Sequence, residues 1–294
     1  MPPYVSRAAL LRGFLVAKPR IQLQRYAHSS PRTLPCFSLE GRTCVVTGAS
    51  QGLGAQILAA FALSGANGAV VDLSQETANK AVSDLKDEAK HAGLPEPKLL
   101  GYECDTSDKD KVVKTFDQIV KDFGKVDVMV TNAGIASGTP AEDYELDEWK
   151  KMLDVNVSGA FLFAQAAGKH MISQKIKGSI IMVSSMSGSI VNRPQKQSAY
   201  NVSKAAVSHL MRSLASEWGE HGIRVNALSP GYIQTAKNEG PEMEKLSKGW
   251  VEMIPLHRIA TPDEFRGTVV WMASDASSYM TGADIIVDGG YTIW

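Results

Sequence analysis

Short apolar runs alternate with longer amphipathic segments along most of this 294-residue chain. The runs are rich in β-branched residues, which is typical of strands that are buried on both faces of a parallel sheet. Strands that alternate with helices in this way predict one doubly wound α/β sheet with helices on both faces. The seven strands are expected at residues 44–46, 69–72, 99–103, 126–131, 179–184, 224–228 and 284–287.

The segments between the strands repeat apolar residues at the spacing of an α-helix. The longest of them, residues 146–174, contains a Ser158-Gly159 pair near its middle. In a sheet of this type ligands bind beyond the carboxyl ends of the strands, so we expect the functional residues there. The helices are expected at residues 55–63, 76–91, 108–123, 146–174, 199–220 and 262–273.

A glycine-rich turn follows the first expected strand. Gly48, Gly52 and Gly54 lie between that strand and the expected helix 55–63. Glycines let the main chain approach a pyrophosphate closely, and a helix N-terminus offers free N–H groups and the positive end of its dipole. The turn therefore predicts a phosphate-binding cradle, although a tight turn without a ligand has the same pattern.

Tyr200 and Lys204 lie four residues apart in an expected helix. This spacing puts both side chains on one helix face, where an ammonium makes a phenol easier to deprotonate. Such a pair can donate and accept a proton in the chemistry of alcohols and ketones. An exposed helix face without a catalytic role is the alternative that the pair alone leaves open.

The order of these motifs resembles the short-chain dehydrogenase/reductase family. The resemblance rests on a Thr-Gly-x-x-x-Gly-x-Gly turn followed by Tyr-x-x-x-Lys, and it covers about residues 38–294. It implies a Rossmann-type sheet and an enzyme that acts on CH–OH groups with a nicotinamide cofactor. Further landmarks of the family match Asn132-Ala133-Gly134, Asn156, Ser184-Ser185, Pro230-Gly231 and Asp288-Gly289-Gly290.

The resemblance also implies the catalytic roles of four residues. Tyr200 would be the general acid or base for the substrate oxygen, and Lys204 would lower the Tyr200 pKa and bind the nicotinamide ribose. Ser185 would hold the substrate oxygen, and Asn156 would anchor a water that relays protons. The cationic nicotinamide and the ammonium would together stabilise the developing alkoxide.

Three serines lie where the family places its substrate-binding serine. We prefer Ser185 over Ser184 and Ser187, because Gly188 follows Ser185 by three residues, as in the family pattern. The separation between Ser185 and Tyr200 is two residues longer than in many members of the family.

The segment between Ser185 and Tyr200 resembles the fungal branch of mannitol, sorbose and xylulose reductases and arabinitol dehydrogenases. Its polar Asn192, Gln195 and Gln197 suit a hydroxylated substrate, although such residues also occur in ordinary loops. The resemblance implies that a polyol such as D-arabinitol is converted to its ketose. An NADPH-dependent ketose or 3-ketoacyl reductase and a nucleotide-sensing module without activity are the alternatives.

An acid, Asp72, ends the second expected strand. A carboxylate at this place binds the adenosine 2′- and 3′-hydroxyls and repels a 2′-phosphate. NADP-preferring relatives usually carry a basic residue beside it or in the glycine turn, where this chain has Leu73 and Gln51. We therefore expect NAD, although most of the fungal branch prefers NADPH. An ordinary acid that faces water is the alternative for Asp72.

The resemblance implies further cofactor contacts. Asp105 and Thr106 would meet the adenine, although Asp105 could equally cap the helix that begins near Asp108. Asn132 would support the sheet, and Thr235 would contact the carboxamide. The full set expected at the cofactor is Gly48, Ser50, Gln51, Gly52, Leu53, Gly54, Asp72, Asp105, Thr106, Asn132, Tyr200, Lys204, Pro230, Gly231, Ile233 and Thr235.

Residues 1–39 differ from the rest of the chain. They contain six basic residues and no acid, and Leu10, Leu11, Phe14 and Leu15 can share one helix face. A basic, amphipathic and acid-free N-terminus is typical of a mitochondrial transit peptide. We expect a transit peptide or a disordered tail at residues 1–39 and a single catalytic domain at residues 40–294. The expected location is the mitochondrial matrix, with the cytoplasm as the alternative.

Composition restricts the partners. Without residues 1–39 the chain has 25 Lys and Arg against 31 Asp and Glu, a net charge of −6, so no attraction to nucleic acid is evident. No apolar run approaches the roughly 20 residues that span a bilayer. The three cysteines have neither disulfide nor metal-ligand spacing, so we expect no metal. The family resemblance implies a homotetramer or a homodimer.

Overall fold

The seven expected strands form one parallel sheet. The computed structural model describes residues 34–234 and 241–294, and in these residues the sheet order is β3-β2-β1-β4-β5-β6-β7. Every pairing of neighbouring strands is parallel, which confirms the predicted doubly wound architecture. The strands are β1 (Thr43–Thr47), β2 (Asn67–Asp72), β3 (Leu99–Glu103), β4 (Val128–Thr131), β5 (Ser179–Val183), β6 (Arg224–Pro230) and β7 (Asp284–Val287).

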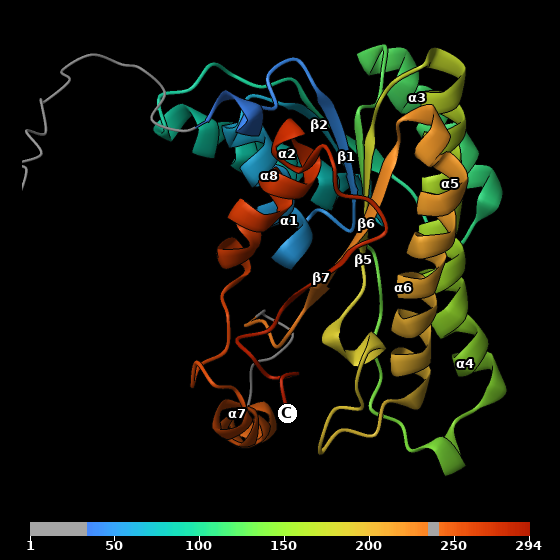
Figure 1. Cartoon of the computed structure of the whole chain (residues 1–294), viewed down its shortest axis with the longest axis vertical. Coiled ribbons are helices and arrows are strands. Elements are labelled where there is room, and N and C mark those ends of the chain that lie inside the picture. Colours follow the sequence, from blue (N-terminus) through green and yellow to red (C-terminus); the bar gives the residue numbers. More distant parts are fainter. Residues whose placement is uncertain (1–33, 235–240) are drawn as a thin grey trace, which may run out of the picture. The chain divides into compact units, whose positions relative to one another are not determined.

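Helices cover both faces of the sheet (Figure 1). Helices α1, α2 and α8 pack on one face, and α3, α5 and α6 pack on the other. In the described part of the chain, no helix has the length and apolar character that crossing a membrane requires. The helices are α1 (Gly52–Leu63), α2 (Gln75–His91), α3 (Lys109–Phe123), α4 (Leu146–Leu153), α5 (Gly159–Gln174), α6 (Ser198–Trp218), α7 (Pro241–Met253) and α8 (Arg266–Ala273).

A separate hydrophobic core lies on each face of the sheet. Successive side chains of a strand point to opposite faces, so Val46 of β1 joins the core under α1 and α8, whereas Val45 joins the core under α3, α5 and α6. Both side chains are fully buried. Strand β1 pairs with β2 on one side and β4 on the other. The chain order reverses between β1 and β4, which is where sheets of this type open to a ligand.

The helical region predicted at residues 146–174 is interrupted. Helix α4 ends at Leu153, a π-helical turn covers Asp154–Ser158, and α5 begins at Gly159. Turns of this kind are rare and frequently occur at functional sites. Here the turn contains Asn156, one of the predicted catalytic residues.

Two segments differ from the sequence prediction. Helix α7 lies in the region 231–258, for which no helix was predicted. At the other end, Leu39 is fully buried and its N–H donates to Ser64 O at 2.9 Å, so residues 34–39 belong to the folded unit. The boundary predicted between residues 39 and 40 is therefore too late. The rest of the predicted transit peptide, residues 1–33, lies outside the described residues.

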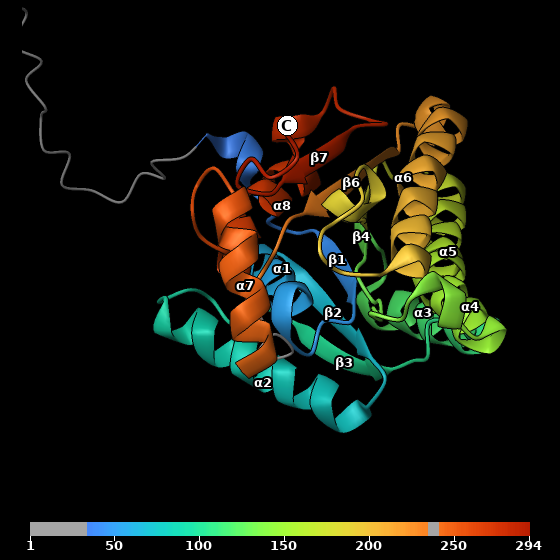
Figure 2. The same cartoon turned by 90° about the horizontal axis from the view of Figure 1, so that it is seen from below.

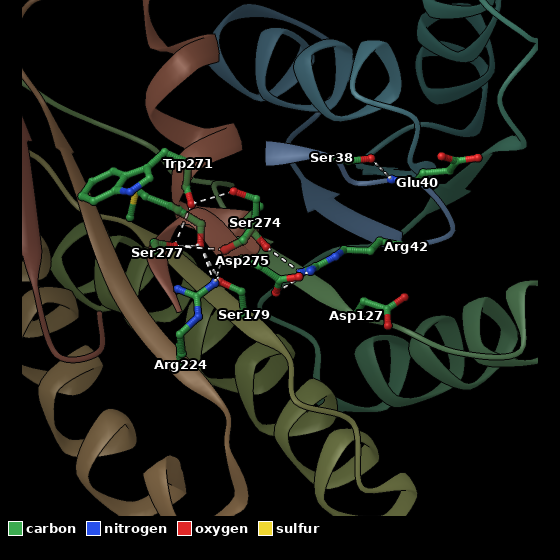
Figure 3. Close-up of polar contacts among 12 residues, drawn as sticks. Ser38, Glu40, Arg42, Asp127, Ser179, Arg224, Trp271, Ser274, Asp275 and Ser277 are labelled. Atoms are coloured by element: carbon green, nitrogen blue, oxygen red, sulfur yellow. Dashed lines mark hydrogen bonds and ion pairs between the residues drawn. The ribbon is translucent and has the colours of Figure 1, made fainter. Parts of the chain in front are cut away.

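Two arginines hold the end of α8 at the edge of the sheet where the strands begin (Figure 3). Arg224, the first residue of β6, donates to Met272 O at 2.9 Å and to Ser274 O at 3.2 Å. Arg42, just before β1, donates to Ala273 O at 2.9 Å. Cations stabilise the carbonyl end of a helix through its dipole. Burial lowers the pKa of Arg224 to about 10.

Candidate active site

A cavity of about 790 Å³ lies beyond the carboxyl ends of β1 to β4. Its walls are the glycine turn, Asp72, residues 104–107, residues 132–135 and one side of α4. Figure 2 looks onto the edge of the sheet where α4 and α7 lie on opposite sides. The volume is within the range of about 300 to 1,000 Å³ that is usual for small-molecule and cofactor sites.

The glycine turn is packed too closely to accept side chains. A Cβ on Gly54 would clash with Gly48 O and would lie 2.5 Å from Asn132 Nδ2. That amide nitrogen donates to Thr47 O at 2.9 Å and to Gly48 O at 3.0 Å, so Asn132 supports the turn from the end of β4. Gly48 has a φ of +64°, which residues with a side chain rarely adopt. The turn fits a dinucleotide phosphate at the N-terminus of α1.

Both carboxylate oxygens of Asp72 are held by main-chain groups at the end of β2. Oδ2 accepts from Ser50 N–H at 2.9 Å, and Oδ1 accepts from Leu73 N–H at 2.8 Å. These bonds fix the carboxylate on the cavity wall and tie the glycine turn to β2. Each oxygen keeps a second lone pair, so ribose hydroxyls can still bind. Gln51 and Leu53 line the same cavity, as does Leu73.

Asp105 and Thr106 also line the cavity, after the end of β3. Asp105 Oδ1 accepts from Ser107 Oγ at 2.7 Å and from Ser107 N–H at 3.0 Å. These bonds hold the pKa of Asp105 below its usual value. Asp108 caps α3 with its own carboxylate, so the alternative role of Asp105 as the helix cap is wrong. Thr106 is buried against Gly159 of α5.

Tyr200 and Ser185 meet between the first turn of α6 and the end of β5. The Ser185 hydroxyl hydrogen-bonds the Tyr200 phenol, and Ser185 Oγ also accepts from Ser187 N–H at 3.1 Å. Burial raises the pKa of Tyr200 above its ordinary value of 10.0, and the bond to Ser185 acts in the opposite direction. The net direction is upward because burial has the larger effect, and the lowering expected from Lys204 does not appear among its causes.

Lys204 is buried one helical turn beyond Tyr200. Its Nζ donates to Val183 O at 2.9 Å and lies 5.7 Å from the centre of the Tyr200 ring. Burial lowers the pKa of Lys204 to about 8. The side chain is therefore still mostly charged at neutral pH, and its ammonium is fixed beside the phenol.

Asn156 is buried, and both its amide oxygen and its amide nitrogen are hydrogen-bonded. Its Oδ1 accepts from Ile135 N–H at 2.8 Å, and its Nδ2 donates to Ile135 O at 2.9 Å and to Ser203 Oγ at 3.0 Å. The π-helical turn places this amide between the loop after β4 and helix α6. Its contacts position the segment that lines the cavity, and the predicted role in water binding stays a prediction.

The structure separates the three serines at the end of β5. Ser184 Oγ lies 2.8 Å from Lys204 O and 2.8 Å from Ser208 Oγ, away from the phenol. Ser187 Oγ accepts from Gln197 Nε2 at 3.2 Å. Of these three serines, Ser185 is the one whose side chain hydrogen-bonds Tyr200, which agrees with the preference from the sequence.

Gly188 permits the close approach between this turn and helix α6. A Cβ at Gly188 would lie 2.9 Å from the carbonyl carbon and 2.9 Å from the oxygen of Lys204. The glycine three residues after Ser185 is therefore required for packing against the helix that carries the catalytic pair.

The polar residues of the loop before α6 form one network with an aromatic cluster. Gln195 Nε2 donates to Tyr232 OH at 3.0 Å, and Gln197 Nε2 lies 3.2 Å from Asn192 Oδ1. Tyr232 stacks on Trp250 of α7 with ring centres 4.1 Å apart. Burial raises the pKa of Tyr232 to about 12. The sequence did not predict that Tyr232 and Trp250 lie here. Their stacking joins two segments in which apolar residues show no helical or strand period.

The segment after β6 holds the last predicted cofactor residues. Gly231 packs so closely that a Cβ would lie 2.6 Å from Asp288 Cα, which explains a glycine after Pro230. Ile233 forms an isolated parallel bridge with Ala260. Thr235 lies outside the described residues.

One wall of the cavity was not predicted. Lys150, Lys151 and Asp154 line it from α4 and the π-helical turn. The sequence could have indicated this wall, because these three residues lie within two helical turns of Asn156 in the same predicted helix.

Comparison with known proteins agrees with this geometry. A family model described as enoyl-(acyl carrier protein) reductase matches residues 48–292. The chain is 42% identical over 268 residues to the NADH-dependent L-xylulose reductase of Ambrosiozyma monospora, covering 89% of this chain and 98% of that protein. It is 40% identical over 271 residues to the ribulose-forming D-arabinitol 2-dehydrogenase of Candida tropicalis, covering 89% and 96%.

A solved structure has the same fold. The crystal structure of a short-chain type dehydrogenase/reductase from Mycobacterium marinum matches with a TM-score of 0.81 and 42% identity, over 87% of this chain and 98% of that one. The chain belongs to the short-chain dehydrogenase/reductase family, whose members are oxidoreductases that use NAD or NADP.

Proposed function

We propose that this protein oxidises a polyol to its ketose with NAD, in the manner of a D-arabinitol 2-dehydrogenase. The strongest support is that Gly134 lies between the cavity and two of the predicted catalytic residues. A Cβ on Gly134 would lie 3.2 Å from Asn156 Oδ1 and 3.6 Å from Lys204 Nζ, and Gly134 also lines the cavity. The ammonium therefore lies directly behind the cavity wall, where it can act on a bound dinucleotide and on Tyr200 together.

The proton chemistry follows from three side chains. The nicotinamide, when bound, supplies the hydride acceptor. Ser185 orients the alcohol oxygen beside Tyr200, whose phenolate takes the alcohol proton. Lys204, charged at neutral pH, stabilises the phenolate that the raised pKa of Tyr200 would otherwise disfavour. Burial of the cluster strengthens this attraction because the surroundings screen it weakly.

The choice of NAD rests on charge. The Asp72 carboxylate is fixed on the cavity wall by two main-chain N–H groups, so it cannot turn away from a 2′-phosphate without losing both bonds. Leu73, 70% exposed beside it, offers no cation to such a phosphate. Repulsion by the fixed carboxylate favours the cofactor that has a free 2′-hydroxyl.

The choice of a polyol rests on the relatives and on the loop before α6. Proteins about 40% identical over nearly the whole chain are named for L-xylulose and D-arabinitol. The amides of Asn192, Gln195 and Gln197 and the Tyr232 hydroxyl follow Ser185 in the chain and are oriented by one another. Sites that hydrogen-bond hydroxyl groups discriminate strongly against substrates that lack them.

A substrate panel tests this proposal. Purified enzyme is assayed with D-arabinitol, xylitol, D-mannitol, D-sorbitol and 2-butanol, each with NAD and with NADP, by the absorbance of the reduced cofactor. We expect a pentitol or hexitol with NAD to give the highest kcat/KM. Faster turnover with NADP contradicts the role of Asp72, and preference for 2-butanol contradicts the polyol assignment.

We also propose import into the mitochondrial matrix, on the basis of the acid-free, basic segment 1–39. A fluorescent protein fused to this segment should enter mitochondria. The same fusion with Arg7, Arg12, Arg20 and Arg25 changed to Glu should stay outside. Cytosolic location of the unaltered fusion contradicts the proposal.

A homotetramer or homodimer is the assembly that we propose. Strand β7 ends the sheet without a neighbour on its outer edge among the described residues, and Ile286 on it is 39% exposed. Ile293 and Trp294 near the chain end are 71% and 82% exposed. Exposed apolar side chains and an open sheet edge both favour association. Sedimentation equilibrium measures the mass, and a monomer at assay concentration contradicts this assembly.

A further inference from the structure

A chain of hydroxyl groups connects the main chain of Lys204 to Asp284 on β7. Ser184 Oγ lies 2.8 Å from Lys204 O and 2.8 Å from Ser208 Oγ. Ser208 Oγ donates to Asp284 Oδ2 at 2.9 Å, and Ser229 Oγ donates to Asp284 Oδ1 at 2.5 Å. The three serines are at most 4% exposed. The chain therefore joins the end of β5, helix α6, β6 and β7 inside the protein.

This chain of hydroxyl groups contacts the residues that hold the catalytic pair. Lys204 is held from two directions, because its Nζ donates to Val183 O at 2.9 Å while its main-chain oxygen contacts the Ser184 hydroxyl. Val183 and Ser184 are consecutive, and Ser185 follows them. A shift of Ser184 therefore moves the acceptor of the ammonium and the serine that contacts Tyr200 at the same time.

The number of available protons couples the orientations of these hydroxyl groups. Three oxygen–oxygen contacts separate Lys204 O from Asp284 Oδ2, but only Ser184 and Ser208 contribute protons to them. A carbonyl and a carboxylate both only accept. When Ser208 donates to the Asp284 carboxylate, Ser184 must serve both Ser208 and Lys204 O with one proton. The orientation of each hydroxyl therefore depends on the group at position 284.

We propose that Asp284 is a positioning residue for the hydride-transfer reaction. It acts through Ser208 and Ser184 on the main chain that carries Lys204 and Ser185, and it touches neither substrate nor cofactor. This inference rests on the roles of Lys204 and Ser185 in the proposed function. The sequence places Asp284 only at the start of an expected strand, so no motif identifies it.

Two substitutions at Asp284 separate positioning from charge. Asp284→Leu removes both acceptors at similar size, and we expect kcat to fall by roughly ten- to a hundredfold, the effect of a small misplacement of reacting groups. The dissociation constant of NADH, measured by fluorescence, should change by less than about twofold, because the Asp72 cavity is untouched. Circular dichroism confirms that the variant is folded at the assay temperature.

Asp284→Asn tests the hydrogen-bond count. The Nδ2 of the asparagine can donate a hydrogen bond to Ser208 Oγ. The Ser208 hydroxyl can then turn to donate to Ser184 Oγ, and the Ser184 hydroxyl donates to Lys204 O. Its Oδ1 still accepts from Ser229, so all four contacts persist. We therefore expect the kcat of Asp284→Asn to stay within about threefold of wild type. If only the carboxylate charge mattered, Asn would not restore the activity that Leu loses.

Ser179→Ala is the matched control. Ser179 is a buried serine at the other end of β5, and its hydroxyl donates to Met272 O at 2.9 Å. The Ser179→Ala substitution should lower the free energy of unfolding and leave kcat unchanged.

Two results overturn the inference. One is a wild-type kcat in folded Asp284→Leu. The other is a loss of kcat in Ser179→Ala or in Asp284→Asn that equals the loss in Asp284→Leu. All variants are assayed with whichever alcohol the wild type oxidises fastest, so an error in the polyol assignment changes the substrate and leaves this comparison intact.

Discussion

Replacement of Lys204 by Met should stabilise the protein while it abolishes activity. The Lys204 side chain is buried, and burial lowers its pKa from 10.5 to about 8. A lowered pKa of a lysine means that the folded state disfavours the charged form relative to the unfolded chain. Methionine has a similar length and no charge, so it fills the same space without this penalty.

The magnitude follows from the pKa difference. A shift from 10.5 to about 8 corresponds to about 3 kcal/mol at about 1.4 kcal/mol per pKa unit. The substitution also removes the hydrogen bond from Nζ to Val183 O, whose loss costs about 1 kcal/mol. The free energy of unfolding of Lys204→Met should therefore exceed that of wild type by about 2 kcal/mol at pH 7.

The gain should depend on pH in a defined direction. Below pH 8 both the folded and the unfolded wild type are protonated, so the full penalty is present. Between pH 8 and 10.5 the folded state loses its proton first, so this group makes the wild type more stable as the pH rises. The difference between the Met variant and wild type should shrink by about 2 kcal/mol between pH 7 and pH 9.5.

Urea denaturation at both pH values measures these differences. Lys80→Met is the control, because Lys80 is 74% exposed and pairs with Asp84 on the surface of α2, so its change should stay within about 0.5 kcal/mol. A Met variant that is less stable than wild type at pH 7, or a difference that does not vary with pH, refutes the reasoning. Detectable alcohol oxidation by the Met variant refutes the catalytic role of Lys204.

Three further changes probe the site and the fold. Tyr200→Phe removes the proton carrier but keeps the ring, so kcat should fall by roughly a hundredfold or more with NADH binding nearly intact, and near wild-type turnover contradicts the assignment. Asp72→Ser should weaken NAD relative to NADP by about 1 to 3 kcal/mol, measured as the ratio of kcat/KM values, and an unchanged ratio contradicts the charge argument. Arg42→Met removes the hydrogen bond to Ala273 O at the end of α8 and the ion pair with Asp275, so the free energy of unfolding should fall by about 1 to 2 kcal/mol with kcat unchanged. A loss below about 0.5 kcal/mol in the same urea assay would show that the arginine does not hold the helix.

The sequence determined the architecture because local patterns carry it. Most strands are apolar runs and most helices have a clear period, so the alternation predicts a parallel sheet without knowledge of any long-range contact. Helix α7 shows the limit of this reasoning. No helix is predicted for its region from apolar periodicity, and its Trp250 is buried by stacking on Tyr232, which precedes the helix in the chain.

The sequence also identified the residues that can do the chemistry. The glycine pattern predicts that Gly54 is part of a phosphate cradle, and the structure explains the glycine by its close approach to Gly48 O. Ser185 was preferred over its neighbours from the position of Gly188, and the structure supplies the reason, since a Cβ at Gly188 would meet the main chain of Lys204. Short motifs of this kind are local, so spacing alone reveals them.

Only the tertiary structure decided how these residues behave. The direction of the Tyr200 pKa is set by burial, which the spacing to Lys204 does not reveal. Ser184 turns out to face Lys204 O and Ser208 instead of the phenol, and Asp284 on the last strand of the sheet lies at the far end of the same hydrogen-bonded chain. Desolvation and the sharing of protons depend on atoms that are distant in sequence and adjacent in space, so they exist only once the sheet and its helices have packed together.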